Sequence, residues 1–70
     1  MKKEELAKIE KYFRRLFQND TIKIKTRPRK DDSAEVFVGE EFVGILYRDD
    51  EDDDLSYNFS MAIREYDLKD

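Results

Sequence analysis

The spacing of the apolar residues changes once along this chain, near Thr21, and no other feature constrains the fold as strongly. Before Thr21, apolar side chains recur at intervals that place them on one stripe of a helix: Leu6, Ile9, Phe13, Leu16 and Phe17. After Thr21, apolar and polar residues alternate, which is typical of half-buried strands. The pattern predicts an α+β fold, in which an N-terminal amphipathic helix over about residues 3–18 packs on an antiparallel sheet.

Four segments carry the strand pattern, and the sequence predicts strands over about residues 21–27, 34–39, 42–48 and 55–64. Pro28 ends the first strand or places it at a sheet edge, and residues 29–33 are expected to form a polar connection. Residues 39–41 are expected to form a short hairpin turn, and the acidic residues 49–54 a further connection. Because all the connections are short, the simplest topology is a four-stranded antiparallel meander with the helix on one face.

The last predicted strand has the most regular alternation in the chain. Apolar residues occupy every second position from Leu55 to Ile63, and serine, asparagine and alanine occupy the positions between them. One face of this strand should therefore belong to the core and the other should face water. The tail breaks the alternation at Tyr66 and Leu68, which predicts a bulge or a segment that leaves the sheet.

Size and composition indicate one domain, residues 1–70, whose stability depends on apolar packing. A chain of this length buries only roughly 60% of its unfolded surface. Cysteine and histidine are both missing, so neither a disulfide nor a zinc site with thiolate or imidazole ligands adds stability. No segment approaches the ~20 apolar residues that cross a bilayer. The N-terminus also lacks the apolar stretch of a signal peptide, so we expect a cytoplasmic protein that does not bind membranes.

The net charge of −4 hides an uneven distribution, because residues 1–30 carry +7 and residues 31–70 carry −11. We expect the basic half to lie against the acidic half, within the fold or across a dimer. Alternatively, the basic strand over residues 23–30 could bind nucleic-acid phosphates together with basic residues of the helix, namely Lys8, Lys11, Arg14 and Arg15. The candidate anion-binding residues of this basic strip are Lys23, Lys25, Arg27 and Arg29. The overall acidity opposes nucleic-acid binding, and lysines that protect a sheet edge explain the strip equally well.

The sequence contains no constellation of residues for catalysis or metal binding. The acidic residues 49–54 could supply oxygen ligands for Ca²⁺, but the glycine and the bidentate glutamate of a calcium loop do not follow at the required spacing. Serine, threonine, tyrosine and lysine remain as nucleophiles, and the chain has no histidine to activate them. We therefore expect neither an enzyme nor a cofactor.

The second and third predicted strands carry apolar side chains on both faces, whereas one helix covers a single face. The uncovered face keeps Phe37, and the parity of the third strand decides its neighbours: Phe42 with Leu46, or Val43 with Ile45 and Tyr47. Contiguous apolar surface marks an interface, unless the sheet curls strongly or the tail folds over it. Our candidate interface residues are Phe37, Phe42, Leu46 and Tyr47. The sequence thus favours a protein-interaction module that binds a partner or a second copy, most simply as a C2 homodimer.

Turn and strand residues in the second half form a recognisable pattern: Gly39, Phe42, Gly44, Tyr47, Asp49, Asp50, Ser56, Tyr57 and Ile63. With these residues the chain resembles a family of short bacterial proteins, chiefly alphaproteobacterial, classed as a domain of unknown function. The resemblance extends over nearly the whole length. It implies a stand-alone bacterial protein, and it implies no activity, substrate or cofactor.

Overall fold

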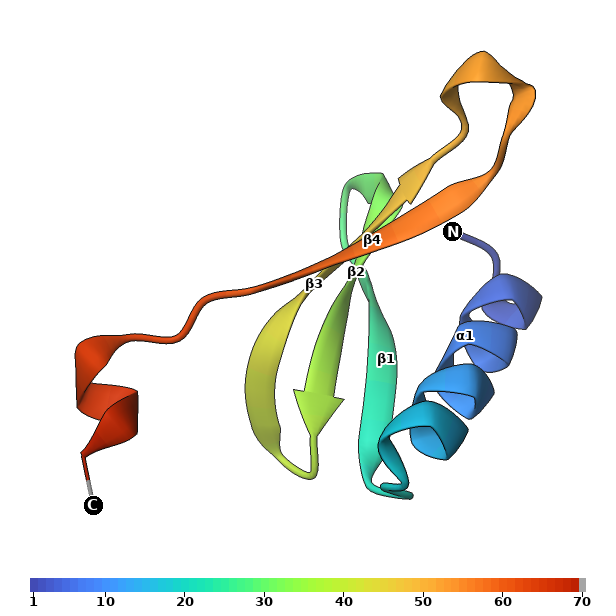
Figure 1. Cartoon of the computed structure of the whole chain (residues 1–70). Helices are drawn as coiled ribbons and strands as arrows, with labels where there is room; N and C mark the ends of the chain where they lie inside the picture. The colour runs from blue at the N-terminus through green and yellow to red at the C-terminus, as the bar shows by residue number, and fades with distance from the viewer. Residues whose placement is uncertain (70) are drawn as a thin grey trace.

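The computed structural model describes residues 1–69, apart from the side chains of Lys30 and Asp52, and it shows one helix beside a four-stranded sheet (Figure 1). The helix α1 spans Lys3–Phe17, and the strands are β1 (Ile22–Arg27), β2 (Lys30–Val38), β3 (Glu41–Asp49) and β4 (Ser56–Met61). The 3₁₀ turn η1 (Glu51–Asp53) connects β3 to β4, and the turn η2 (Glu65–Leu68) follows β4. Neighbouring strands are antiparallel in the order β1-β2-β3-β4, which confirms the predicted α+β meander.

The core lies between α1 and the first three strands. Its helical members are Leu6, Ile9 and Phe13, and the sheet contributes Ile22, Ile24, Ala34, Val36 and Leu46. The two remaining residues of the predicted stripe, Leu16 and Phe17, are 55% and 54% exposed. They stay exposed because α1 packs closely against β1 and stands away from the far side of the sheet. The helix therefore covers only part of the face on which it lies.

The helix is attached to the outer edge of β1 through two charged side chains. The backbone N–H of Ile24 donates to Oε2 of Glu10 at 2.9 Å, and Nε of Arg14 donates to the carbonyl of Ile22 at 2.9 Å. Arg14 and Glu10 also form an ion pair with each other at 3.2 Å. An edge strand normally exposes such backbone groups to other strands. In this fold α1 binds two of them, the N–H of Ile24 and the carbonyl of Ile22, so that edge is partly covered.

The polar segment 30–33, expected from the sequence to be a connection, is instead the beginning of β2. Only Pro28 and Arg29 form the turn, and Arg29 adopts a positive φ of 68°. Ser33 is buried, and its hydroxyl accepts a hydrogen bond from Arg27 at 3.3 Å. The sequence prediction was wrong here because Lys30 pairs with Arg27 of β1 and Ser33 pairs with Tyr47 of β3, which outweighs the low strand propensity of Asp and Ser.

A β-bulge in β3 decides which of its side chains face the helix. Val36 pairs with Gly44 while Phe37 pairs with Phe42, so Val43 is the extra residue of the bulge. As a result Phe42 joins Phe37 on the face away from α1, and Val43 packs against the core. Strict alternation along the strand, which the sequence analysis assumed, would have placed Phe42 on the same face as Leu46.

β4 is shorter than the strand predicted over residues 55–64, because β3 offers it no partner beyond Gly44, which pairs with Met61. The chain then continues as an extended segment into η2 and projects away from the sheet (Figure 1). The prediction that the tail leaves the sheet is therefore confirmed.

The two glycines provide a matched test of how closely β3 and β4 approach. A Cβ on Gly44 would lie against the carbonyl oxygen of Ser60 and 2.7 Å from Cε1 of Phe59, whereas a Cβ on Gly39 would meet open space. We predict that Gly44→Ala lowers the free energy of unfolding by about 2 to 3 kcal/mol through overpacking. Gly39→Ala, at a φ of +63°, should cost only about 1 kcal/mol. Urea denaturation of both variants measures the difference, and equal losses would contradict the close approach.

Candidate interaction surface

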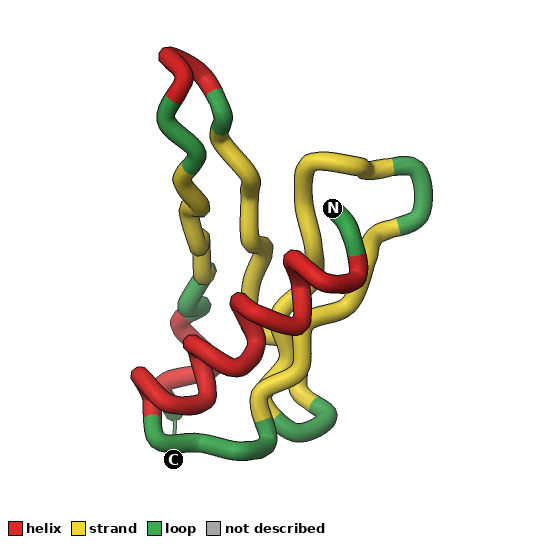
Figure 2. The backbone as a smooth tube through the Cα atoms, turned by 90° about the vertical axis from the view of Figure 1, so that its right-hand side faces the viewer, coloured by secondary structure: helices red, strands yellow, loops and turns green. Residues whose placement is uncertain are grey.

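An open groove runs between α1 and β4 on the helix side of the sheet. Figure 2 shows α1 crossing this face while the β1–β2 and β3–β4 hairpins diverge towards their tips. The rings of Phe13 and Phe59, with centroids 5.6 Å apart, bridge helix and strand and divide the groove into two cavities. The cavity beside the N-terminal end of α1, which we call the upper cavity, has a volume of about 650 Å³. The cavity beside Phe17 at the C-terminal end of α1, which we call the lower cavity, has a volume of about 220 Å³.

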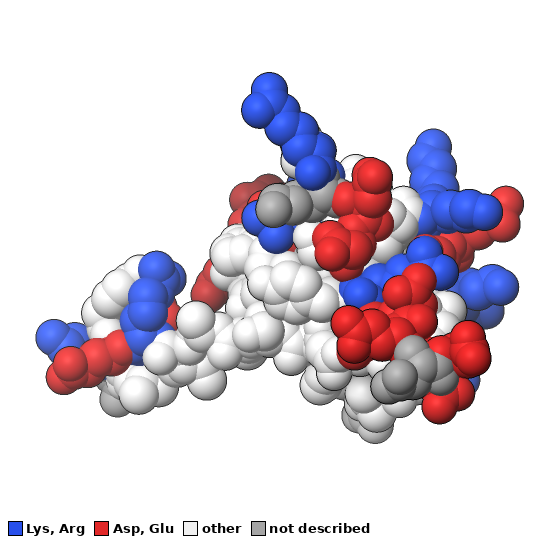
Figure 3. Space-filling model, turned by 90° about the horizontal axis from the view of Figure 1, so that it is seen from above, with Lys and Arg blue, Asp and Glu red and all other residues white. Residues whose placement is uncertain are grey.

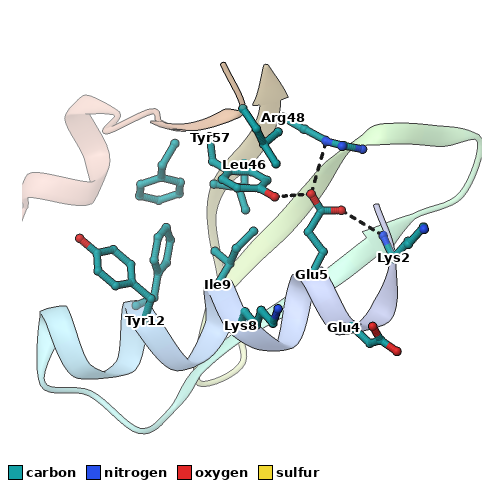
Figure 4. A pocket seen from close by; sticks show the side chains of 12 residues that line it. Lys2, Glu4, Glu5, Lys8, Ile9, Tyr12, Leu46, Arg48 and Tyr57 are labelled. Carbon is teal, nitrogen blue, oxygen red and sulfur yellow. Dashed lines mark hydrogen bonds and ion pairs between the residues drawn. The ribbon is translucent and has the colours of Figure 1, made fainter. Parts of the chain in front are cut away.

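A polar cluster centred on Glu5 lies in the upper cavity (Figure 4). The Tyr57 hydroxyl of β4 donates a hydrogen bond to the Glu5 carboxylate, and Nε of Arg48 on β3 forms an ion pair with it at 3.4 Å. The backbone N–H of Lys2 donates to the second carboxylate oxygen at 3.3 Å. Three segments of the chain thus meet at one carboxylate.

The Glu5 cluster shifts two pKa values in directions that suit a structural contact. The hydrogen bond from Tyr57 lowers the pKa of the Glu5 carboxyl below its ordinary value, with smaller help from Lys2 and Arg48. Burial, and next the bond to Glu5, raise the pKa of the Tyr57 hydroxyl. A general acid needs a raised carboxyl pKa and a nucleophilic phenol needs a lowered one. Both pKa shifts run in the other direction. The contacts of the cluster join α1 to β3 and β4.

The lower cavity is lined almost entirely by apolar side chains, and much of its rim is exposed. Phe17 at the end of α1 is 54% exposed and Met61 on β4 is 51% exposed. Leu55, which lines the upper cavity, is 52% exposed. We refer to this surface, formed by Phe17, Val38, Leu55, Phe59 and Met61, as the open side. Sequence reasoning missed the open side, because it assumed that a helix covers the whole face of the sheet on which it lies.

The opposite face of the sheet carries most of the predicted interface residues. Phe37 and Phe42 pack together with ring centroids 5.7 Å apart, and Tyr47 is 44% exposed. Leu46 must be removed from this set, because it lies in the core beneath α1 and is only 1% exposed. Half-buried Ile45 takes its place. Nζ of Lys25 lies 4.8 Å from the Phe37 ring and covers part of the patch.

Two basic residues of β1, Lys25 and Arg27, make local contacts. Lys23 and Lys25 alternate with the buried isoleucines and so face away from α1, and Lys25 sits opposite Glu35. Arg27 donates to Ser33, and Arg29 lies in the exposed turn. Figure 3 shows positive and negative side chains interleaved over the body of the molecule. The structure does not join the basic strand and the basic helix into one face.

The acidic segment and the tail occupy two projecting ends. Asp49 ends β3, and its side chain accepts a hydrogen bond from the N–H of Glu51 at 3.1 Å at the start of η1. In the tail, Ile63, Tyr66 and Leu68 are 62%, 59% and 73% exposed. Within residues 1–69 no helix combines the length and apolar character needed to cross a membrane.

The Glu5 cluster makes the stability of the fold depend on pH. Because folding lowers the pKa of Glu5, its contribution is present above the ordinary glutamate pKa and is lost as the pH falls through the folded-state value. We predict that Tyr57→Phe destabilises the fold by about 1 kcal/mol at neutral pH. This difference should shrink once the pH falls below about 4. Tyr47→Phe, on the opposite face, should change nothing, and a pH-independent loss in Tyr57→Phe would refute the assignment.

Comparison with known proteins identifies a family and no nearer relative. The model of the family described as Protein of unknown function (DUF3126) matches residues 5–67. That range includes most of α1, the entire sheet and most of η2. No curated protein and no solved structure gives a significant match. The chain therefore belongs to the DUF3126 family of proteins of unknown function.

Proposed function

We propose that this protein acts by binding, as a small interaction module that self-associates through its open side. The observation that carries this proposal is the row of exposed apolar side chains along the groove, of which Phe17, Leu55 and Met61 are each more than half exposed. Large contiguous apolar surfaces on small proteins mark interaction sites. A non-enzymatic role is supported by the Glu5 cluster, whose pKa shifts oppose acid or nucleophile chemistry.

The open side is a better interface than the face predicted from the sequence. The opposite face keeps an aromatic patch of Phe37, Phe42 and Tyr47, but Lys25 lies over one of its rings. Polar residues of β4, Ser56, Asn58 and Ser60, alternate with the groove residues and so flank that patch. The lower cavity of the groove contains no charged lining residue. Burying this part of the groove would therefore desolvate no charged side chain of its lining.

A second copy is the partner that we favour. Among the residues whose side chains the structure describes, eight buried apolar residues form the core, and a chain of this size gains much of its stability from any further burial. Residues 56–61 of β4 carry no charge, so two copies can approach there without repulsion despite their acidic composition.

The proposal includes the cytoplasmic location and the chiefly alphaproteobacterial origin inferred from the sequence.

Two lysine substitutions on opposite faces test this function. We predict that the wild-type protein is a dimer by light scattering at high concentration, and that Met61→Lys is a monomer, because it places a charge in the groove. Tyr47→Lys, at a similarly exposed position on the opposite face, should remain a dimer. Circular dichroism should show that both variants are folded.

Two outcomes would contradict the proposal. A wild-type protein that stays monomeric at the highest attainable concentration would exclude self-association. A dimer that dissociates in Tyr47→Lys and persists in Met61→Lys would move the interface to the opposite face of the sheet.

A further inference from the structure

The two edges of the sheet differ in how their backbone groups are satisfied. The outer edge of β1 is occupied by Glu10 and Arg14 of α1. The outer edge of β4 has no such cover: within the described chain, the residues Ser56–Met61 make backbone pairs with β3 alone. This strand contains no proline and no charged residue, the two features that usually protect an edge. β4 is therefore open to pairing with another strand.

The sequence around β4 is symmetrical about Phe59. Leu55 and Tyr57 precede it at two-residue spacing, and Met61 and Ile63 follow it at the same spacing. Small or polar residues fill the positions between, and the segment is bounded by a negative charge at Asp54 and a positive charge at Arg64. An antiparallel partner with the same sequence would match this pattern at every position.

We infer that β4 pairs antiparallel with β4 of a second copy, with the two Phe59 residues opposite each other at a two-fold axis. This inference rests on the proposed self-association and specifies its geometry: the β4 edges join, and the β4 side of the open side packs beside its counterpart in the second copy. In this register Leu55 lies opposite the second copy's Ile63, and Tyr57 lies opposite its Met61. All the apolar side chains of both strands then share the open side, and Ser56, Asn58, Ser60 and Ala62 share the other face.

The charges at the two ends of the segment select this register. Asp54 falls opposite the second copy's Arg64, so the dimer gains an ion pair at each end. In the single chain the Arg64 side chain is 64% exposed and is paired with Asp67 of its own η2 at 3.3 Å, so it is accessible to a new partner. A shift of one residue would set apolar side chains opposite polar ones on the wrong face. A shift of two residues would keep the apolar side chains of both strands on one face, but Asp54 would no longer lie opposite Arg64 of the second copy.

The same register explains why the strand pattern is longer than the observed strand. Alternation runs through Ile63, whereas β4 ends at Met61, where β3 stops pairing. The second copy supplies partners for Ala62, Ile63 and Arg64 from its residues 54–56. Pairing would thus extend β4 over the length that the sequence predicts.

Charge reversal tests the register in the full-length protein. Asp54→Arg and Arg64→Asp each place like charges opposite each other at both ends, and each should weaken the dimer about 10-fold in sedimentation equilibrium. The double variant Asp54→Arg with Arg64→Asp restores opposite charges and should recover wild-type affinity. Recovery distinguishes a contact between copies from the local pair of Arg64 with Asp67, which the double variant does not restore.

Disulfide trapping tests the same register without relying on affinity, and the native chain contains no cysteine to interfere. Ser56 and the second copy's Ala62 are directly opposite, with Cβ atoms about 5 Å apart. A tagged Ser56→Cys protein mixed with Ala62→Cys should form a mixed disulfide on mild oxidation. Ser56→Cys alone should not form one, since its two copies of residue 56 lie about 20 Å apart along the strands.

The outcomes separate this inference from the proposed function. Rescue by the double charge variant together with the mixed disulfide supports pairing through β4. If the affinity of the dimer is unchanged by all the charge reversals and no mixed disulfide forms, the inference is overturned while self-association stands. A protein that is monomeric at every concentration overturns both.

Discussion

Two side chains of α1, Glu10 and Arg14, bind backbone groups on the outer edge of β1, and this attachment determines where the helix lies on the sheet. A helix about 10 Å wide covers roughly two strands that are spaced about 4.8 Å apart. With α1 held at one side, β4 is covered only in part, through the contacts of Phe13 with Phe59 and of Glu5 with Tyr57. The groove, the two cavities and the exposed rim of the open side all follow from that off-centre position.

Features that depend on local spacing could be predicted from the sequence. The helical stripe ending in Phe17 and the alternation around Phe59 both correspond to observed elements, because each pattern follows from one period of the backbone. The bulge at Val43 could not be predicted, since one extra residue in a strand leaves no mark on composition or length. That single residue moved Phe42 to the opposite face and left Leu46 in the core.

The Glu5 cluster was beyond sequence reasoning for a different reason. Its members come from α1, β3 and β4, and a lone glutamate on a helix of mixed charge resembles any solvated residue until the sheet is placed against it. Long-range contacts of this type depend on how α1 crosses the sheet. The exposed tail, in contrast, was foreseeable, because Tyr66 and Leu68 break an otherwise regular alternation. The pattern of residues along the sequence thus indicated which segments were irregular, whereas the packing of α1 on the sheet determined which polar side chains came into contact.

The partly covered edge of β1 also bears on assembly size. Sheets polymerise into fibres when each added molecule presents a fresh edge to the next one. In the described fold β1 is a poorer edge for that purpose, since Glu10 and Arg14 already bind the N–H of Ile24 and the carbonyl of Ile22. Once β4 is used, a pair of molecules is bounded by a helix at each end of the joined sheet. α1 would then hinder the addition of further strands at both ends, which favours a pair of copies over a fibre.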